Sequence, residues 1–401
     1  MSKSQVSIVK TGSRPDYDAV LAAVRKSIDL IGGLDDVVKS GQLVLINPSW
    51  VAAPADKETG TCTWPEVSRA VADVIKAAGA RPIIAESSAV GVDCEKVIKE
   101  SGHAELRDLG YEVVNLKEDK TVKLPVPGGG LIFDPMPVWE TVARADVIIT
   151  VPVLKTHDQT EMTCSIKKLK GLLPDKTKRA FHQQGLFDAV IDLMAAVKPS
   201  LTIVDAIICQ EGMAPIYGDA VEMDLVLASR DLVAADTICG LIIGYQPDDL
   251  KLSVNAAQRG LGVMDPAAIE VVGESVESVQ RRFVRASEAA PKVTVNGFKL
   301  IFGEETCTGC RNTVYSVLHQ LDGEGNLDYL EKIAMLTGGA EFPVEGAANG
   351  VVTVGDKCTP KDRRGDRHAK GCPPNSIDVV QAILGDRGKA KRTYADDPDS
   401  D

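Results

Sequence analysis

Four cysteines in the last quarter of the chain have the types and spacing that suit a metal centre. Cys307 and Cys310 form a C-x-x-C motif, and Cys358 and Cys372 follow at longer intervals. Two thiols about one helical turn apart can bind the same ion or the same face of a cluster. Cys372 precedes two prolines, which shape the turn around its sulfur and remove backbone donors.

These four thiols predict a 4Fe-4S cluster. A tetrahedral zinc ion is the alternative, although zinc commonly takes two tight C-x-x-C pairs. Thiols that share no ligand are a third interpretation. If all four cysteines bind the cluster, no iron stays open to a substrate, so the cluster transfers electrons and does not act as a Lewis acid.

A basic run separates the last two of these cysteines. It contains Lys361, Arg363, Arg364, Arg367 and Lys370. Cations beside four thiolates would stabilise a reduced cluster, and an acidic electron-transfer protein would dock on them. An ordinary solvated loop accounts for the run equally well.

A second group of reactive residues lies at 151–185, where this acidic chain becomes basic. Lys155 and His157 follow the aliphatic run at 147–154, and open α/β sheets bind ligands beyond the carboxyl ends of their strands. A lysine and a histidine in that position could bind a carboxylate or a phosphate. The ordinary pKa of histidine is near neutrality, so His157 could also act as a general acid or base. The catalytic candidates are therefore Lys155, His157 and His182.

Other polar residues near strand ends are candidates for binding the same small anionic ligand. They are Asn47, Glu86, Thr156, Lys168, Lys170, Asp205 and Glu211. A solvated helix face is an equally good interpretation of Lys167, Lys176 and Lys178. The two familiar glycine-rich phosphate loops are absent, so the sequence lends no support to a nucleotide-binding enzyme.

Helical and strand patterns alternate along the chain and must position these groups. Helices are predicted at 17–33, 64–80, 185–197 and 231–244, and strands at 42–48, 81–88, 112–116, 147–154, 201–207, 224–229 and 269–273. Continuous aliphatic runs predict strands that are covered on both faces. The predicted fold is α/β, with a largely parallel sheet covered by helices and a smaller cysteine-bearing α+β unit at the C-terminus.

The predicted boundaries divide the chain into three parts. Residues 1–298 form an α/β ligand-binding domain, and its division into two lobes near 150–200 stays open. Residues 299–388 form the iron-sulfur unit around a helix at 312–321, and 389–401 form a flexible acidic tail.

Composition limits the partners. A net charge of -12 and a pI near 5.1 disfavour binding to nucleic acid or to anionic membranes. The N-terminus lacks the apolar core of a signal peptide, and no apolar run approaches the ~20 residues of a membrane span, which predicts a cytoplasmic protein. Nine cysteines in a reducing compartment do not predict a disulfide framework.

Several runs together resemble a known family. VPVLKTH, SIKKLKGLLP, LTIVDAI, QEGMAPIYGD and LASRDLVAADTI, in this order, look like the domain-of-unknown-function family numbered 362. The match covers roughly residues 5–275 and is most specific at 151–240. Members are often described as iron-sulfur proteins of anaerobic bacteria and archaea, so the resemblance implies an iron-sulfur protein. This chain lacks the compact C-x-x-C-x-x-C run that many members carry.

Two functions fit these observations. In the first, an iron-sulfur oxidoreductase binds a small anion near Lys155 and His157 and exchanges electrons through its cluster with that ligand or with a protein partner. In the second, a non-catalytic accessory module uses a structural cluster or zinc ion and docks on a partner through the basic loop. Whether the chain is an enzyme, and in which oligomeric state it works, does not follow from the sequence.

Overall fold

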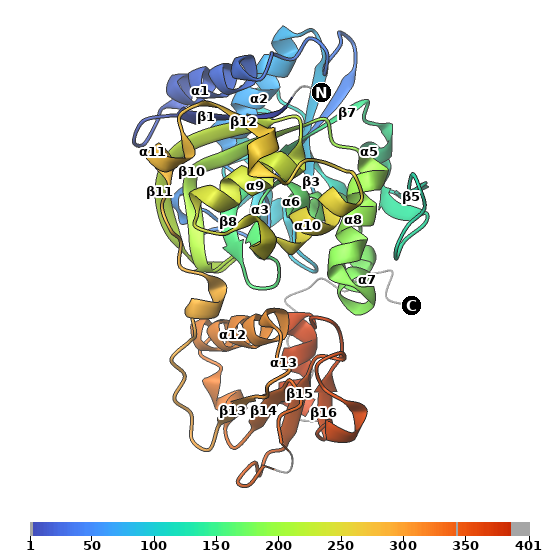
Figure 1. The fold of residues 1–401 in the computed structure, drawn as a ribbon, viewed down its shortest axis with the longest axis vertical. Coiled ribbons are helices and arrows are strands. Elements are labelled where there is room, and N and C mark those ends of the chain that lie inside the picture. Colours follow the sequence, from blue (N-terminus) through green and yellow to red (C-terminus); the bar gives the residue numbers. More distant parts are fainter. Residues whose placement is uncertain (1–2, 342–343, 386–401) are drawn as a thin grey trace.

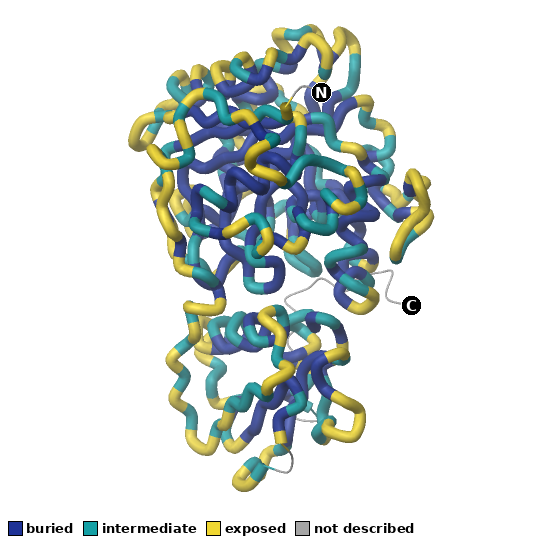
Figure 2. Tube along the Cα trace, in the orientation of Figure 1, coloured by how far each residue is buried: buried dark blue, intermediate teal, exposed yellow. Residues whose placement is uncertain are grey.

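The computed structural model describes residues 3–341 and 344–385, which form two stacked units (Figure 1). The larger unit holds a ten-stranded sheet between helices, and the smaller unit, drawn in orange and red, lies at one end of it. Buried residues follow the large sheet, and a second buried centre lies in the small unit (Figure 2). The acidic tail predicted at 389–401 falls outside the described residues.

The large sheet combines a parallel part with a long antiparallel hairpin. Pairings from β10 through β7, β2 and β3 to β4 are parallel, while β11 runs antiparallel to β1 and β10. The predicted α/β fold with a largely parallel sheet is confirmed. The strand order is β12 (Ile269–Gly273), β1 (Ser4–Lys10), β11 (Tyr217–Ser229), β10 (Leu201–Met213), β7 (Val147–Val151), β2 (Leu43–Pro48), β3 (Arg81–Glu86) and β4 (Val113–Asn115); β8 (Val153–His157) pairs with β10 and with β9 (Glu161–Thr163).

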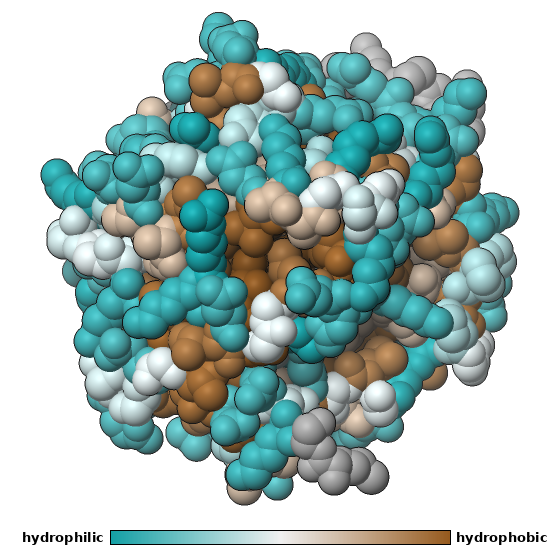
Figure 3. Space-filling view, turned by 90° about the horizontal axis from the view of Figure 1, so that it is seen from above, coloured by the Kyte–Doolittle hydropathy of each residue, from teal (hydrophilic) through white to brown (hydrophobic). Residues whose placement is uncertain are grey.

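Side chains of the central strands alternate between two apolar layers. In β2, Val44 and Ile46 pack under α1 and α2, whereas Leu45 packs with α8 and α10 in the opposite layer. Burial on both faces explains why the strands are continuously aliphatic. The end of the molecule remote from the small unit is mostly hydrophilic, with hydrophobic residues in its recesses (Figure 3). The covering helices are α1 (Tyr17–Leu30), α2 (Pro65–Ala77), α8 (Leu186–Val197), α9 (Leu232–Ile242) and α10 (Lys251–Gln258).

Three stretches differ from the predicted strands. The run 147–154 is interrupted at Pro152, which has no amide for the ladder, and the chain then continues as β8, so Lys155 and His157 lie within a strand. The strands predicted at 201–207 and 224–229 are longer than expected, because the β10–β11 ladder extends as far as Met213 and Tyr217. No predicted element covers β1.

The C-terminal unit is built on four parallel strands. α12 (Thr308–Gly323) and α13 (Ser376–Leu384) pack against this sheet, and α12 lies between the sheet and the large unit (Figure 1). The sequence predicts only the helix at 312–321, because strands of three or four residues leave too short a periodic signal. The strands are β13 (Lys299–Phe302), β14 (Ala334–Thr337), β15 (Val351–Val354) and β16 (Arg367–Ala369).

Asp192 on α8 attaches a surface loop to the core. Its buried carboxylate accepts hydrogen bonds from the backbone amides of residues 131–133 at 2.7–2.9 Å and pairs with Arg259 at 2.5 Å. The loop joins β5 (Thr121–Leu124) to β6 (Met136–Trp139). One side chain therefore satisfies three amides and one guanidinium.

Replacing Asp192 with alanine is expected to destabilise the protein by about 2–4 kcal/mol, because three part-buried amides and a part-buried guanidinium lose their acceptor. Urea unfolding measures the change. The matched control is Asp36→Ala, which removes a pair of similar length, 2.6 Å to Arg230, from the exposed surface. That variant should lose less than about 1 kcal/mol, and equal losses in the two variants would contradict the assigned role.

Candidate functional site

A cavity lies beyond the carboxyl ends of the large sheet, on the side of the C-terminal unit. Residues 49–51 follow β2, residues 87–90 follow β3, and both segments line it together with part of β8. The strand order reverses at β2, because the chain runs outward to β3 and β4 and returns to β7 on the other side of β2. α/β sheets bind ligands at such a switch point. The cavity volume is about 260 Å³.

Lysines dominate the charge of the cavity. Burial lowers the pKa of each, because a buried ammonium group loses its hydration. An excess of cations in a protein of net charge -12 favours an anionic ligand. The lining charged residues are Lys155, Lys167, Lys168, Lys170 and Lys178, with Glu86 and Asp158 as the carboxylates.

Lys155 is almost completely buried, with 1% of its surface exposed. Its ammonium donates hydrogen bonds to the carbonyl oxygen of Thr61 at 2.6 Å and to that of Pro215 at 3.4 Å. Burial lowers its pKa to about 8. No carboxylate of the described residues lies within ion-pair distance, so only backbone carbonyls oppose this charge from close range.

Lys168 and Glu86 form a buried ion pair beneath the cavity. The Nζ–Oε1 distance is 2.6 Å, and Lys168 also donates to Asn47 Oδ1 at 3.1 Å. The second oxygen of Glu86 accepts the amide of Trp50 at 2.8 Å. Gly171 makes room for the pair, since a Cβ there would lie 2.3 Å from Glu86 Oε1. The pair thus joins β2, β3 and the lysine-rich segment.

Two lysine–histidine pairs face the cavity. Lys167 Nζ lies 3.0 Å from His157 Nε2, and Lys170 Nζ lies 2.8 Å from His182 Nε2. Burial, followed by the neighbouring lysine, lowers the pKa of His157 to about 4 and that of His182 well below its usual value. Both imidazoles are therefore neutral at pH 7. Each lies one hydrogen bond from its lysine, at the distance that proton transfer requires.

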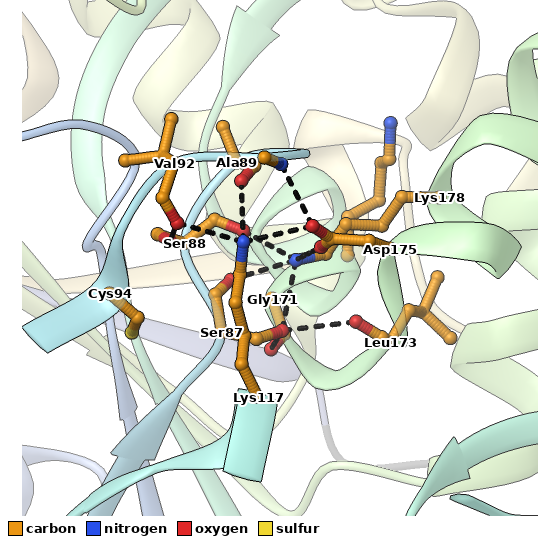
Figure 4. Close-up of polar contacts among 12 residues, drawn as sticks. Ser87, Ser88, Ala89, Val92, Cys94, Lys117, Gly171, Leu173, Asp175 and Lys178 are labelled. Atoms are coloured by element: carbon orange, nitrogen blue, oxygen red, sulfur yellow. Dashed lines mark hydrogen bonds and ion pairs between the residues drawn. The ribbon is translucent and has the colours of Figure 1, made fainter. Parts of the chain in front are cut away.

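Lys178 on α7 (Asp175–Gln184) fixes the loop that follows β3 (Figure 4). Its Nζ donates to the carbonyl and the hydroxyl of Ser87, both at 2.9 Å, and lies 3.4 Å from Asp175. Lys117 binds the same carboxylate at 2.9 Å. Lys178 is thus buried in the cavity wall, whereas Lys176 on the same helix is exposed. The dense lysines after the aliphatic run were the available signal for Lys167 and Lys178.

The C-terminal unit closes one side of the cavity. Ser316 of α12 and residues 375–377 at the start of α13 belong to its lining. Gln159 of the large unit donates from Nε2 to Thr313 Oγ1 at 2.9 Å and to the carbonyl of Pro374 at 3.2 Å. Neither unit alone forms the complete cavity.

A further hydrogen bond joins the cavity wall to a candidate metal ligand. The amide of Cys372 donates to the carbonyl of His182 at 3.1 Å. The segment that carries Cys372 therefore contacts the wall of the cavity.

Three of the four predicted cysteine ligands lie together. The sulfurs of Cys307, Cys310 and Cys358 are within 4.8 Å of one another. Cys307 caps the N-terminus of α12, where its sulfur accepts the amide of Cys310 at 3.5 Å. Hydrogen bonds from Cys310 and Cys358 hold the pKa of the Cys307 thiol well below its usual range. These three cysteines could bind a metal ion.

Cys372 lies near this group of three cysteines but does not belong to it. Burial raises the pKa of its thiol, and nearby Cys307 and Cys358 add to the rise. The next residue, Pro373, packs on the C-x-x-C turn, since a Cβ on Gly309 would lie 3.3 Å from the Pro373 ring. The predicted fourth ligand is therefore close to the other three without matching their spacing.

The donor set fits a soft metal or a cluster. Thiolates alone, without carboxylate or imidazole, suit zinc and iron-sulfur centres. Gly355 leaves the space beside the sulfurs open, since a Cβ there would lie 2.5 Å from Cys310 Sγ and 2.7 Å from Cys358 Sγ.

The arginines of the basic loop are engaged with the protein itself. Arg363 donates to the carbonyl of Gly339 at 2.7 Å, and Arg364 pairs with Asp356 at 2.8 Å. Arg367 donates to two backbone carbonyls at 2.6 Å. These three therefore fasten the loop, whereas Lys361 and Lys370 are exposed.

Four of the predicted ligand-binding residues do not line the cavity. Asn47 lies behind it and accepts Lys168, and the Thr156 hydroxyl donates to the carbonyl of Gly212 at 2.9 Å. Asp205 accepts the amide of Trp64 at 2.8 Å. Glu211 lies in β10 and accepts the amide of Val284 at 2.8 Å. The cavity does bring together Glu86, Lys155, His157, Lys168, Lys170 and His182.

Comparison with known proteins gives the family. The model described as Domain of unknown function (DUF362) matches residues 44–240. The thylakoid-associated protein sll1697 of Synechocystis sp. is 31% identical over 276 residues, which span 66% of this chain and 82% of that protein. The chain belongs to the DUF362 family. The matched residues contain all of the cavity's lysines but none of the clustered cysteines.

One solved structure resembles the whole chain distantly. The lactate racemase apoprotein from Thermoanaerobacterium thermosaccharolyticum has 10% sequence identity and a TM-score of 0.38, covering 96% of this chain and 91% of its own.

Within residues 3–341 and 344–385, no helix has the length and apolar character needed to cross a membrane.

Lys155 is expected to make stability depend on pH. Between its folded pKa of about 8 and its unfolded value near 10.5, the unfolded state binds more protons, so this contribution to stability rises with pH. From pH 7.5 to 9.5, the wild-type protein should gain on the order of 1–2 kcal/mol relative to Lys155→Met.

Chemical denaturation at the two pH values measures this gain. Comparing the two proteins removes the effect of cysteines, which ionise in the same range. The exposed variant Lys176→Met is the control and should track the wild type at both pH values. If the stability of the wild type and of Lys155→Met changed equally between the two pH values, Lys155 would have an ordinary pKa in the folded protein.

Proposed function

We propose that this protein is an iron-sulfur redox protein that binds a small anion beside a 4Fe-4S cluster in its C-terminal unit. The observation that supports it best is the hydrogen bond from the Cys372 amide to the His182 carbonyl. It puts the backbone of a candidate cluster ligand in contact with a residue that lines the cavity. In this proposal, electrons pass between the bound anion and the thiol-held group by way of this contact.

The residues of the cavity have distinct parts in this proposal. Lys155, Lys167 and Lys170 attract the anion; Lys167 lies beside His157, and Lys170 lies beside His182. His157 and His182 exchange protons with the ligand, because they are neutral and lie one hydrogen bond from a lysine. A bound 4Fe-4S cluster supplies single electrons.

The electron partner in this proposal is an acidic protein of the cytoplasm. Lys361 and Lys370 are exposed near the cysteines and supply complementary charge. The fastened arginines keep their loop in one shape, which favours a defined docking surface.

A structural role for the metal is the second candidate function. The three arginines that fasten the basic loop support it, since they make the surroundings of Cys358 a rigid unit that one ion would complete. In this case the chain is an accessory module, and its metal passes no electrons.

Metal analysis of protein purified without oxygen distinguishes the two functions. The redox proposal expects about four irons and about four acid-labile sulfides per chain, with an EPR signal that changes on addition of dithionite. Cys358→Ser should lose most of the iron and the signal. The matched control is Cys239→Ala, which changes a thiol buried in α9 and should keep both.

One zinc per chain without sulfide would overturn the redox proposal and favour the accessory module. The same measurement on Cys372→Ser decides whether this cysteine is the fourth ligand. Iron retained in that variant with an unchanged EPR signal would show that Cys372 is not a ligand, whereas loss of iron or an altered signal would make it the fourth ligand.

A further inference from the structure

We propose that the ligand of the cavity carries a phosphoryl group, and that this group is held from both units, by lysines of the large unit and by the N-terminus of α13. The inference rests on the proposed function only in using the same cavity and its anionic ligand. It names the chemical class of that ligand and the residues that recognise it.

Three lysines of the cavity have no carboxylate partner among the described residues. Lys168 pairs with Glu86 and Lys178 pairs with Asp175. Lys155 has only carbonyl partners, and Lys167 and Lys170 face histidines. A phosphoryl dianion would supply the negative charge that these three ammonium groups lack.

The C-terminal unit adds a helix terminus to the same cavity. Asn375, the N-cap of α13, lines it together with Ser376 and Ile377, the first residues of the helix; the Asn375 side chain accepts the Ile377 amide at 2.9 Å, and the Ser376 amide is left for a ligand. Amides at a helix N-terminus and the helix dipole favour phosphate groups. The acidic residue of the first turn, Asp378, is exposed and is not part of the lining. The lysines and this terminus therefore present positive potential from opposite units.

The kind of cation favours phosphate over carboxylate. No arginine is among the described residues that line the cavity, although arginine is the side chain whose planar fork matches a carboxylate. Lysine is a common point-charge ligand of phosphate. The volume of about 260 Å³ lies just below the range of roughly 300–1,000 Å³ for drug-sized ligands. A small phosphate monoester therefore fits better than a nucleotide.

Isothermal titration of the full-length, metal-loaded protein tests the inference. The ligands are inorganic phosphate, glycerol 3-phosphate and succinate, with the last as the dicarboxylate. Both phosphates should bind, and succinate should bind at least tenfold more weakly. The relative affinity of the two phosphates tells whether free phosphate or an ester is preferred. Stronger binding of succinate, or no binding of either phosphate, would overturn the inference.

Three variants assign the binding to the two units. Lys167→Gln with Lys170→Gln should weaken phosphate binding at least tenfold, and the exposed Lys176→Gln should leave it unchanged. Ser376→Asp puts a negative charge at the α13 terminus, which favours the helix but repels the ligand, so it should weaken binding without lowering the melting temperature. Unchanged binding in Ser376→Asp would remove α13 from the site.

The two proposals fail separately. Phosphate binding by a protein that holds zinc would keep this inference and reject the redox function. An iron-sulfur protein that ignores both phosphates would do the reverse.

Discussion

The ion pair between Lys168 and Glu86 is the interaction on which the cavity depends. Charges so deeply buried cost several kcal/mol each unless they are paired and hydrogen-bonded, and here the remaining bonds go to Asn47 and to the amide of Trp50. These contacts fix the ends of β2 and β3 relative to the lysine-rich segment.

The remaining buried lysines lower the stability of the fold and favour the binding of an anionic ligand. Lys155, Lys167 and Lys170 line the same cavity although burial disfavours their charged forms. A protein tolerates this when the charge serves a ligand, since perturbed ionisable groups gather at functional sites. The rest of the large unit, with apolar layers on both faces of its sheet, supplies the stability that offsets the cost.

Sequence reasoning reached the large sheet and the lysine segment because their signals are local. Long aliphatic runs and helical periodicity extend over five residues or more, and Lys155 and His157 adjoin such a run. It did not reach the small parallel sheet, whose strands have three or four residues. Nor could it predict that the carboxylates of Asp205 and Glu211 accept hydrogen bonds from backbone amides. The donors, Trp64 and Val284, are distant from them in the chain. The contribution of α13 to the cavity is equally non-local.

The placement of the tryptophans gives this protein a built-in optical probe. The chain has three indoles; Trp50 lines the cavity, and Trp139 donates from its indole nitrogen to the hydroxyl of Ser87 in the cavity wall at 3.1 Å. Trp64, whose backbone amide donates to Asp205, is not among the residues that line the cavity. Two of the three indoles therefore lie within or against the cavity wall, so tryptophan fluorescence can report on events there without any added label.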